Sequence, residues 1–272
     1  MKDSSYGITK QSEVKGVFEQ HLEELLILGY TVLENVLNEK ELADIRQRLD
    51  GVYQQQVKES KENQYQLSDI NEQNVARMIF AYDPYFLGLV TNSIVLEYVK
   101  RVIGNFFMLH LQNGIINMPN EKHHQSSWHR DLPYQDFVIS KSISVNALYC
   151  IDEFSEKTGG TQLVPYSHKM ETIPSDHYIS KHAWQATAPA GSVILMDSMV
   201  FHRAGYNSSS NIRRGINQVY VAGILKQQMN IPALLKGKHS DDALLRMILG
   251  YEAAEAGSVN EYRMRRVKKM KP

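Results

Sequence analysis

A histidine and an aspartate stand two residues apart in the segment Ser127-Trp128-His129-Arg130-Asp131. In an extended strand successive side chains point to opposite faces, so His129 and Asp131 are expected to project from the same face. One imidazole nitrogen and one carboxylate oxygen suit a divalent ion such as Fe(II), and a second histidine would fill a third position of an octahedron. A lone His-x-Asp tripeptide is a weak signal, so the metal hypothesis depends on that third ligand.

His202 is the third ligand that the sequence favours. It follows the strand-like segment Ser192–Asp197 after a short turn. Strands that are distant in sequence pair in a jelly roll, so a ligand far along the chain from Asp131 is geometrically reasonable. His168 is a rival, but we interpret it as a turn residue that forms a hydrogen bond with the backbone. Three further histidines are interpreted as surface residues: His21, His123 and His124.

Two adjacent arginines, Arg213 and Arg214, open a predicted strand after His202. A guanidinium group binds a carboxylate through two parallel hydrogen bonds, which suits the far end of a dicarboxylate whose other end chelates a metal. Because the two arginines alternate faces, only one can point inward. The alternative is that both are exposed cations at the edge of a strand.

The first third of the chain has the apolar spacing of helices. Gly29 is predicted to end the first helix, and Asn38 with Glu41 forms a capping box for the second. The polar run Gln54–Ser68 is interpreted as a loop or a frayed helix. The predicted elements are a helix over 14–28, a strand over 30–33, a helix from Asn38 through Leu49, and two or three helices between Asn71 and Ile103, one of them Ser93–Val102.

From residue 106 the pattern changes to short apolar runs with period two, separated by turn residues. The predicted strands are Phe106–Met118, Ser142–Ile151, Thr161–Val164, Trp184–Thr187, Ser192–Met196 and Arg213–Leu225. Helices followed by such strands predict a mainly β fold with α-helices: a double-stranded β-helix of the jelly-roll or cupin-like type, flanked by N-terminal helices. We expect a single domain over 1–272, with a helical part at about 14–104, a jelly-roll core at 105–226 and a C-terminal helical tail at 227–272, including a helix over Asp241–Leu249.

The charge balance points away from nucleic acid and from an anionic membrane as partners, because 30 basic and 30 acidic residues cancel among 272. The basic C-terminal segment is interpreted as a solvated end of the chain. No apolar run approaches the length of a membrane span. The only cysteine, Cys150, lies in an apolar run and is predicted to be a buried thiol, and the polar start does not look like a signal peptide. We expect a cytoplasmic protein that acts on a small molecule, and the oligomeric state stays open.

The order His-x-Asp, distal His, then Arg makes the chain resemble the phytanoyl-CoA dioxygenase family of Fe(II)/2-oxoglutarate-dependent oxygenases. The resemblance also rests on the segment Thr158–Lys169, which is similar to the family's N-G-x-L-x-x-x-P-G-S-H-K turn and strand. It extends from about Gly29 to Tyr220.

The resemblance implies His129, Asp131 and His202 as iron ligands and Arg213 as the anchor of 2-oxoglutarate. It further implies Gln112 and Asn117 as polar residues that help to hold the co-substrate. The reaction it implies consumes 2-oxoglutarate and O2, releases succinate and CO2, and hydroxylates a C–H bond of a small molecule. Because Asp131 is present, hydroxylation, desaturation or ring formation is favoured over halogenation.

Two positions depart from the family pattern. Ala204 stands where many members carry a serine that assists the co-substrate carboxylate, so Arg213 is expected to need another partner. Tyr166 replaces the glycine of the P-G-S-H turn, which we expect to change the turn without touching the metal.

Three residues are weaker candidates for the substrate pocket: Trp128, Asn146 and Tyr149, each of which has an equally plausible packing role. The loops expected to select the substrate are Gln54–Ser68, Pro133–Ser140 and Met170–His182. Two other functions stay open: a metal-dependent cupin-type enzyme that does not use 2-oxoglutarate, and a non-catalytic metal-binding β-barrel protein.

Overall fold

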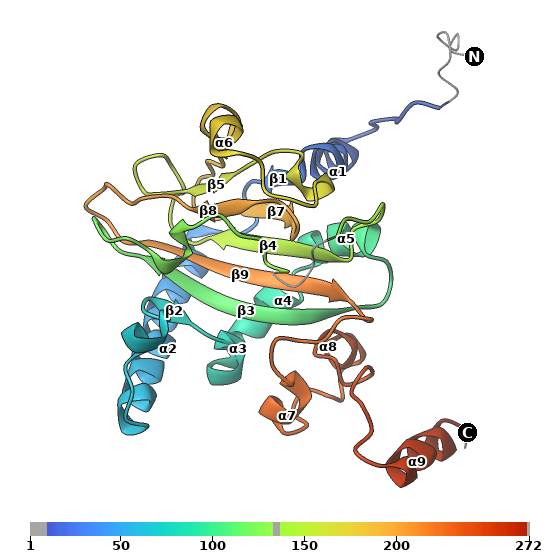
Figure 1. Ribbon diagram of the computed structural model, residues 1–272. Helices are drawn as coiled ribbons and strands as arrows, with labels where there is room; N and C mark the ends of the chain where they lie inside the picture. Colours follow the sequence, from blue (N-terminus) through green and yellow to red (C-terminus); the bar gives the residue numbers. More distant parts are fainter. Residues whose placement is uncertain (1–9, 133–136, 271–272) are drawn as a thin grey trace.

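Two antiparallel sheets lie at the centre of the computed structural model, which describes residues 10–132 and 137–270 (Figure 1). In spatial order, the six-stranded sheet contains β1 (Tyr30–Leu33), β7 (Val193–Asp197), β4 (Ser144–Cys150), β9 (Arg213–Ala222), β3 (Phe107–Asn117) and β2 (Val75–Ala76). The three-stranded sheet contains β6 (Trp184–Gln185), β5 (Thr161–Leu163) and β8 (His202–Ala204). This is the jelly-roll core that the strand pattern predicts.

The register between β3 and β9 fixes which side chains enter the space between the sheets. Asn117 pairs with Arg213 and Asn113 pairs with Asn217, and these pairs lie on the inner face, toward the smaller sheet. Residues one position along, such as Gln112, lie on the outer face. A β-bulge between Leu109 and Leu111 interrupts the register near one end of β3.

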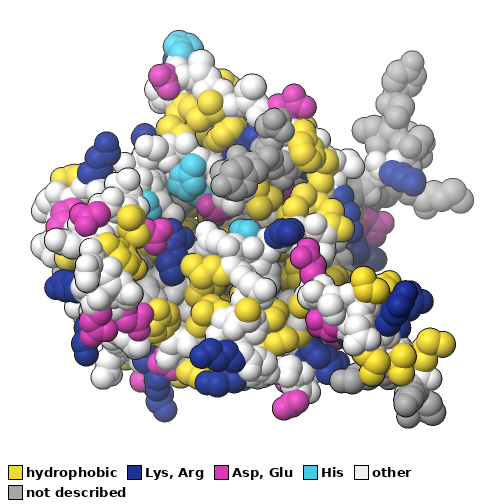
Figure 2. Space-filling view, turned by 60° about the horizontal axis from the view of Figure 1, so that its bottom comes forward, with side chains coloured by type: hydrophobic (Ala, Val, Ile, Leu, Met, Phe, Trp, Pro, Cys, Tyr) yellow, Lys and Arg dark blue, Asp and Glu magenta, His cyan; other side chains and the backbone are white. Residues whose placement is uncertain are grey.

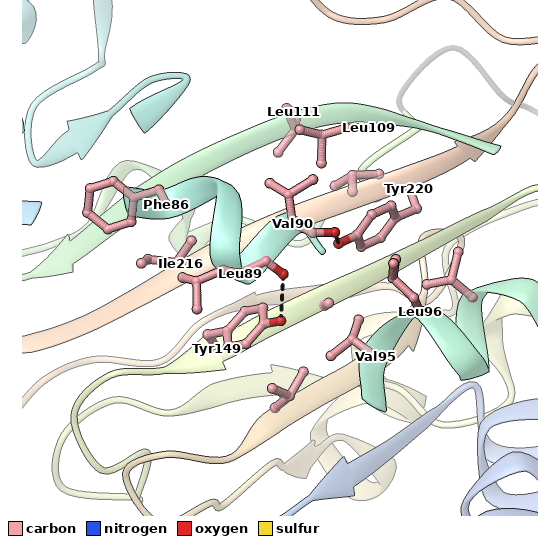
Figure 3. Close-up of a cluster of buried hydrophobic side chains, with 14 of the residues drawn as sticks. Phe86, Leu89, Val90, Val95, Leu96, Leu109, Leu111, Tyr149, Ile216 and Tyr220 are labelled. Carbon is pink, nitrogen blue, oxygen red and sulfur yellow. Dashed lines mark hydrogen bonds between the residues drawn. The ribbon is translucent and has the colours of Figure 1, made fainter. Parts of the chain in front are cut away.

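The two faces of the large sheet are buried in different cores. On the inner face a small cluster that includes Leu148, Cys150 and Ile194 fills the space between the sheets. Cys150 is buried as predicted. On the outer face the strands pack against helices in a larger cluster, part of which Figure 3 shows.

The N-terminal helices cover the outer face of the large sheet. They are α1 (Val17–Leu28), α2 (Glu39–Glu62), α3 (Ile79–Tyr82), α4 (Leu87–Val90) and α5 (Ser93–Val102), with short 3₁₀ turns at Leu67–Ile70 and Pro84–Phe86. Gly29 ends α1 with a φ of 88°, the left-handed conformation that glycine adopts most readily. The predicted capping box of Asn38 and Glu41 begins α2. The boundaries of α5 are those predicted, and the Asn92 side chain caps it.

The interpretation of Gln54–Ser68 as a loop or frayed helix is wrong for its first half, because α2 continues to Glu62. Tertiary contacts hold this polar half of the helix. The Gln56 side-chain amide exchanges two hydrogen bonds with the backbone of Arg77, at 2.7 and 2.8 Å. Val52 and Ser60 are buried on the same helix.

Short helices complete the described chain: 3₁₀ turns at His124–Ser126 and Ser167–Lys169, then α6 (Asp176–His182), α7 (Ile231–Leu235), α8 (Ala243–Ile248) and α9 (Val259–Met270). Helix α8 confirms the helix predicted at 241–249. Helix α9 stands away from the sheets in Figure 1. Within the described ranges, no helix combines the length and apolar character that crossing a bilayer requires. On the face in Figure 2, basic and acidic side chains are interspersed.

Candidate active site

His129, Asp131 and His202 converge at the inner face of the large sheet. One donor atom from each lies within 4.8 Å of the other two. Asp131 Oδ1 is 3.7 Å from His129 Nε2 and 3.8 Å from His202 Nε2. Both separations exceed a hydrogen bond, so the three donors face a common point without bonding one another. The structure therefore brings together the three residues that the sequence predicts as metal ligands.

Backbone pairing places these side chains. The amides and carbonyls of His129 and His202 exchange two hydrogen bonds of 3.0 Å, and the Asp131 amide donates to the Ser198 carbonyl at 3.1 Å. The segment around His129 is thus extended beside β8. Alternation along that extended segment sends His129 and Asp131 to one side, as predicted.

Each histidine is oriented so that the lone pair of its Nε2 atom is free to bind a metal. Nδ1 of His129 donates to the Ser127 carbonyl at 2.8 Å, and Nδ1 of His202 donates to the Val200 carbonyl at 2.9 Å. Because a carbonyl only accepts, both Nδ1 atoms carry a proton. Burial lowers the pKa of His202, which favours the neutral imidazole that binds a metal.

Two amides hold Asp131 by its other oxygen. Asn217 Nδ2 donates to Oδ2 at 3.0 Å, and Asn146 Nδ2 donates to the same atom. Burial acts to raise the pKa of Asp131, but the imidazoles of His202 and His129 and the two amides together hold it below its ordinary value. A carboxylate with Oδ1 free and two imidazole Nε2 atoms form a donor set that fits Fe(II).

Arg213 is a buried cation that lacks an acidic partner. It is 2% exposed and donates through Nη2 to the Gly159 carbonyl at 2.8 Å, while its guanidinium lies 4.3 Å from the centre of the Phe154 ring. Nε has no partner, and among the described residues no carboxylate bonds this side chain. Burial lowers the pKa of Arg213 to about 10, so it remains charged at neutral pH.

The neighbouring Arg214 points the other way. It forms ion pairs with Asp50 at 2.8 Å and with Asp152 at 3.1 Å. The prediction that only one of the two arginines points inward is confirmed, and Arg213 is that one.

Arg213 shares a narrow compartment with the three predicted ligands. This inner compartment, of about 30 Å³, is also lined by Thr161 and Ala204, which are opposite one another in β5 and β8. Thr161 is 5% exposed, and its hydroxyl has no hydrogen-bond partner in the part of the chain that the structure describes. Sequence reasoning missed Thr161, although it marked the missing hydroxyl at Ala204.

A much larger outer cavity, of about 790 Å³, opens on the other side of His129 and Asp131. Its wall is formed by β3, the start of β2, Asn217 and the segment Leu225–Gln228. Ile115, Gln125, His129, Asp131 and Asn217 line both spaces. The candidate ligands thus lie between a small charged compartment and a roomy cavity.

The two further residues predicted to hold the co-substrate lie on opposite faces. Asn117 is on the inner face beside Arg213, but its amide donates to the Gly205 carbonyl at 3.0 Å. Gln112 faces the helices and donates to the Phe86 carbonyl at 2.9 Å. The co-substrate role predicted for Gln112 is therefore wrong, because the sheet separates its side chain from the inner compartment.

The three residues predicted to line the substrate pocket lie in different parts of the structure. Tyr149 lies in the helix-facing core and donates to the Leu89 carbonyl at 2.9 Å, so its proposed place in the pocket is wrong (Figure 3). Trp128 packs beside Phe201 with Arg203 over its ring at 4.6 Å, and it lines neither space. Asn146 is fully buried and contacts Asp131, so it positions a candidate ligand.

Among the other histidines, His168 behaves as predicted, because Nε2 bonds the Leu26 carbonyl at 3.2 Å. The interpretation of His123 as a surface residue is wrong: it is 7% exposed, and burial lowers its pKa to about 3. Tyr166 adopts a φ of 66°, the left-handed conformation expected of glycine, so the expectation that this residue changes the turn is wrong for the backbone conformation.

Two of the three loops expected to select the substrate do not have the position that this role requires. Neither 54–68 nor 170–182 lines the outer cavity, and 170–182 contains α6. In the third loop, Phe137 lines the cavity, while residues 133–136 lie outside the described chain.

Two imidazoles and one carboxylate on one side of a prospective ion, inside a jelly roll, are the arrangement typical of non-haem Fe(II) oxygenases. The chain matches the sequence profile of the family described as phytanoyl-CoA dioxygenase (PhyH) over residues 28–215. It belongs to the phytanoyl-CoA dioxygenase family, whose members are oxygenases that use Fe(II) and 2-oxoglutarate.

Two relatives are similar over most of their length. The uncharacterised protein Rv1501 of Mycobacterium tuberculosis is 32% identical over 254 residues, which cover 90% of each chain. A probable alpha-ketoglutarate-dependent hypophosphite dioxygenase of Stutzerimonas stutzeri is 24% identical over 230 residues, covering 76% of this chain and 79% of the relative.

Solved structures share the fold at low identity. The nickel complex of the non-haem monooxygenase ThoJ has a TM-score of 0.59 at 14% identity and covers 77% of this chain and 80% of its own. The alpha-ketoglutarate-dependent carbocyclase SnoK from nogalamycin biosynthesis has a TM-score of 0.56 at 15% identity, with 75% and 83% covered.

Proposed function

We propose that this protein is an Fe(II)- and 2-oxoglutarate-dependent dioxygenase that hydroxylates a C–H bond of a small molecule and releases succinate and CO2. In this proposal His129, Asp131 and His202 hold the iron, and Arg213 binds the far carboxylate of 2-oxoglutarate. The observation that carries the proposal is the buried guanidinium of Arg213, which has no acidic partner among the described residues and lies in the compartment that the three candidate ligands line. A desolvated cation without an anion is costly unless a ligand supplies one.

The protein's part in the reaction is to hold and orient. When bound, the iron and 2-oxoglutarate would supply the electrons that activate O2 for oxidation of the substrate. Asn217 and Asn146 engage Asp131 through Oδ2 and so leave Oδ1 turned toward the two Nε2 atoms. The Nδ1 hydrogen bonds of the histidines fix their ring orientation.

The inner compartment supports the placement of the co-substrate. Its lining contains both Arg213 and the candidate ligands, which suits a molecule that carries a carboxylate for each. At about 30 Å³ the compartment is narrow, so binding of 2-oxoglutarate requires side chains of its lining to move. We propose that Thr161 provides the hydroxyl that Ala204 lacks.

The presence of Asp131 favours transfer of oxygen over transfer of halide, because a carboxylate occupies the position that a halide would need. Hydroxylation is the outcome that we propose. Ring formation is the alternative within the same class, since SnoK, which shares the fold, is a carbocyclase.

The test is an anaerobic titration of metal-free protein with Fe(II) and then 2-oxoglutarate, followed through the visible metal-to-ligand charge-transfer band. We expect the band in the wild type, its loss in Asp131→Ala and His202→Ala, and at least about 30-fold weaker binding of 2-oxoglutarate in Arg213→Ala, because two charge-assisted hydrogen bonds are removed. Arg214→Ala is the matched control, since that side chain faces Asp50 and Asp152, and it should keep the band.

Other outcomes decide between the alternatives. Iron binding without the band would favour a cupin-type enzyme that does not use 2-oxoglutarate. Failure to bind Fe(II) would favour a non-catalytic binding protein that keeps the β-barrel without turnover.

A further inference from the structure

The side chains that line the outer cavity can select its ligand. Its volume of about 790 Å³ lies within the range of small-molecule sites and far exceeds what a small inorganic ion fills. Apolar side chains such as Leu111, Leu132 and Leu225 form part of its wall. The question is which polar groups of this wall are free to bind.

The buried cation in this wall bonds mainly the protein's own backbone. Arg130 donates to the carbonyls of Met199 at 3.0 Å, Glu171 at 2.9 Å and Ser167 at 3.3 Å, and also to that of Met170. Its guanidinium lies 3.9 Å from the centre of the Phe201 ring. Arg130 therefore uses four of its five N–H groups on the protein's own backbone, and no acidic side chain bonds it in the described chain.

The two other cations that line the cavity have acidic partners. Arg77 Nε donates to Glu72 Oε2 at 2.7 Å, and its Nη2 contacts the other carboxylate oxygen. The Lys226 ammonium group is 3.6 Å from Glu255, and its side chain is 88% exposed, so it points into solvent. Within the described part of the lining, every cation thus has a partner or a solvated charge.

His110 differs from these residues because it presents an open acceptor. It lines the cavity and is placed there by the β-bulge between Leu109 and Leu111, a device that redirects a side chain. Nδ1 donates to the Lys226 carbonyl at 2.9 Å, so the proton of the neutral ring is on Nδ1. Nε2 then carries a lone pair, and it has no partner among the residues described. Burial lowers the pKa of His110, which favours this neutral form.

We infer that the outer cavity takes an uncharged, largely apolar small molecule whose hydroxyl or amide N–H donates a hydrogen bond to His110 Nε2. This inference rests on the proposed function, in which the cavity is the substrate site beside the iron. It separates this chain from an enzyme for a small anion such as the hypophosphite named for the relative in Stutzerimonas stutzeri. It also disfavours a ligand whose phosphate groups must enter the cavity, because the cations of the described wall are already bonded to the backbone or to acidic side chains.

The test compares three probes of one shape: 2-naphthol, which has a donor; 2-methoxynaphthalene, which has none; and 2-naphthoate, which is an anion at neutral pH. Binding is measured calorimetrically on metal-free protein and again on protein loaded with Mn(II) and 2-oxoglutarate. We expect 2-naphthol to bind tightest and 2-naphthoate at least about tenfold more weakly, since its charge would be buried without a partner.

The variant His110→Phe removes the acceptor and keeps a ring. It should weaken 2-naphthol about fivefold, the effect of one neutral hydrogen bond, and leave 2-methoxynaphthalene unchanged. His182→Phe, an exposed histidine of α6 outside the cavity, is the control and should change neither probe.

Tight binding of 2-naphthoate, or an equal loss of 2-naphthol and 2-methoxynaphthalene in His110→Phe, would overturn the inference. The wild-type ranking of the probes tests it even if the variant does not fold. Because the metal-free arm needs neither iron nor 2-oxoglutarate, failure here is distinguishable from loss of the charge-transfer band, which would refute the proposed function.

Discussion

At the scale of single residues, one hydroxyl group distinguishes the co-substrate end of this site from the pattern that the family resemblance implies. Ala204 lacks it, and Thr161 lies directly opposite on the paired strand with its own hydroxyl unpartnered within the described chain. Both residues line the compartment that holds Arg213. A hydrogen-bond donor can thus reach the same space from either strand.

We predict that Thr161→Val weakens binding of 2-oxoglutarate about tenfold, because a hydrogen bond to a charged carboxylate is lost while the shape is kept. Thr161→Ser keeps the hydroxyl group and should restore the binding of 2-oxoglutarate. The double variant Thr161→Val with Ala204→Ser should recover most of the affinity, since the hydroxyl then comes from β8. Titration of the charge-transfer band measures each constant, and an unchanged constant in Thr161→Val would contradict the role.

Strand parity explains which site residues the sequence could predict. Asn146 and Tyr149 are three positions apart on β4, so they cannot face the same side, and the structure places only Asn146 inward. Gln112 and Asn117 are an odd number of positions apart on β3, so their side chains also lie on opposite faces. Counting alternation from Arg213 would also have found Asn217, which holds Asp131. His110 could not be found in this way, because the bulge breaks the alternation.

At the scale of elements, the turn before β5 supports Arg213. The Gly159 carbonyl accepts the hydrogen bond from Arg213, and the residue has a φ of 73°. A Cβ atom there would lie 2.5 Å from the Gly205 carbonyl oxygen and 2.8 Å from Asn117 Nδ2. Only glycine fits where β5, β8 and β3 come together.

Gly159→Ala should therefore destabilise the protein by about 1–3 kcal/mol from its backbone conformation alone and weaken 2-oxoglutarate binding, because the partner of Arg213 shifts. Gly51→Ala is the matched control. Gly51 lies inside α2 with nothing within 4 Å of the added Cβ, so alanine should stabilise by about 0.5–1 kcal/mol. Denaturant unfolding measures both, and equal effects of the two substitutions would contradict this account.

The sequence predicted the helices whose starts depend on interactions between residues close together in the chain. The capping box of Asn38 and the spacing of Ser93–Val102 predicted helix starts that the structure has. The polar half of α2 was missed because its partner, the backbone of Arg77, comes from a distant segment. Strand β8 was missed because three residues carry too little pattern, and its partners in β5 and at His129 are also remote in sequence.

At the scale of the whole molecule, the candidate ligands join two distant parts of the chain. A metal held by His129, Asp131 and His202 crosslinks the segment before β4 to β8 in the folded state only. Binding that is specific for the folded state stabilises it by mass action.

We expect Mn(II) at a hundred times its dissociation constant to stabilise the wild type by about 2.7 kcal/mol, which corresponds to a rise in melting temperature of roughly 5–10 °C. Asp131→Ala and His202→Ala should lose most of this rise, and a chelator should reverse it. His182→Ala, on exposed α6, should respond like the wild type. Equal responses of Asp131→Ala and wild type would place the ion elsewhere.

The paired backbones of His129 and His202 also bear on which metal the protein acquires. Two backbone hydrogen bonds of 3.0 Å hold these residues side by side. Because the backbone places these ligands, folding adds little discrimination between metals. For nitrogen and oxygen ligands, the affinity of a site for divalent metals rises from Mn(II) through Fe(II) and Co(II) to Ni(II) and Cu(II). With these residues as ligands, the occupant is decided by the supply of metals in the surroundings, so protein purified over a nickel resin should carry nickel that displaces iron and suppresses turnover.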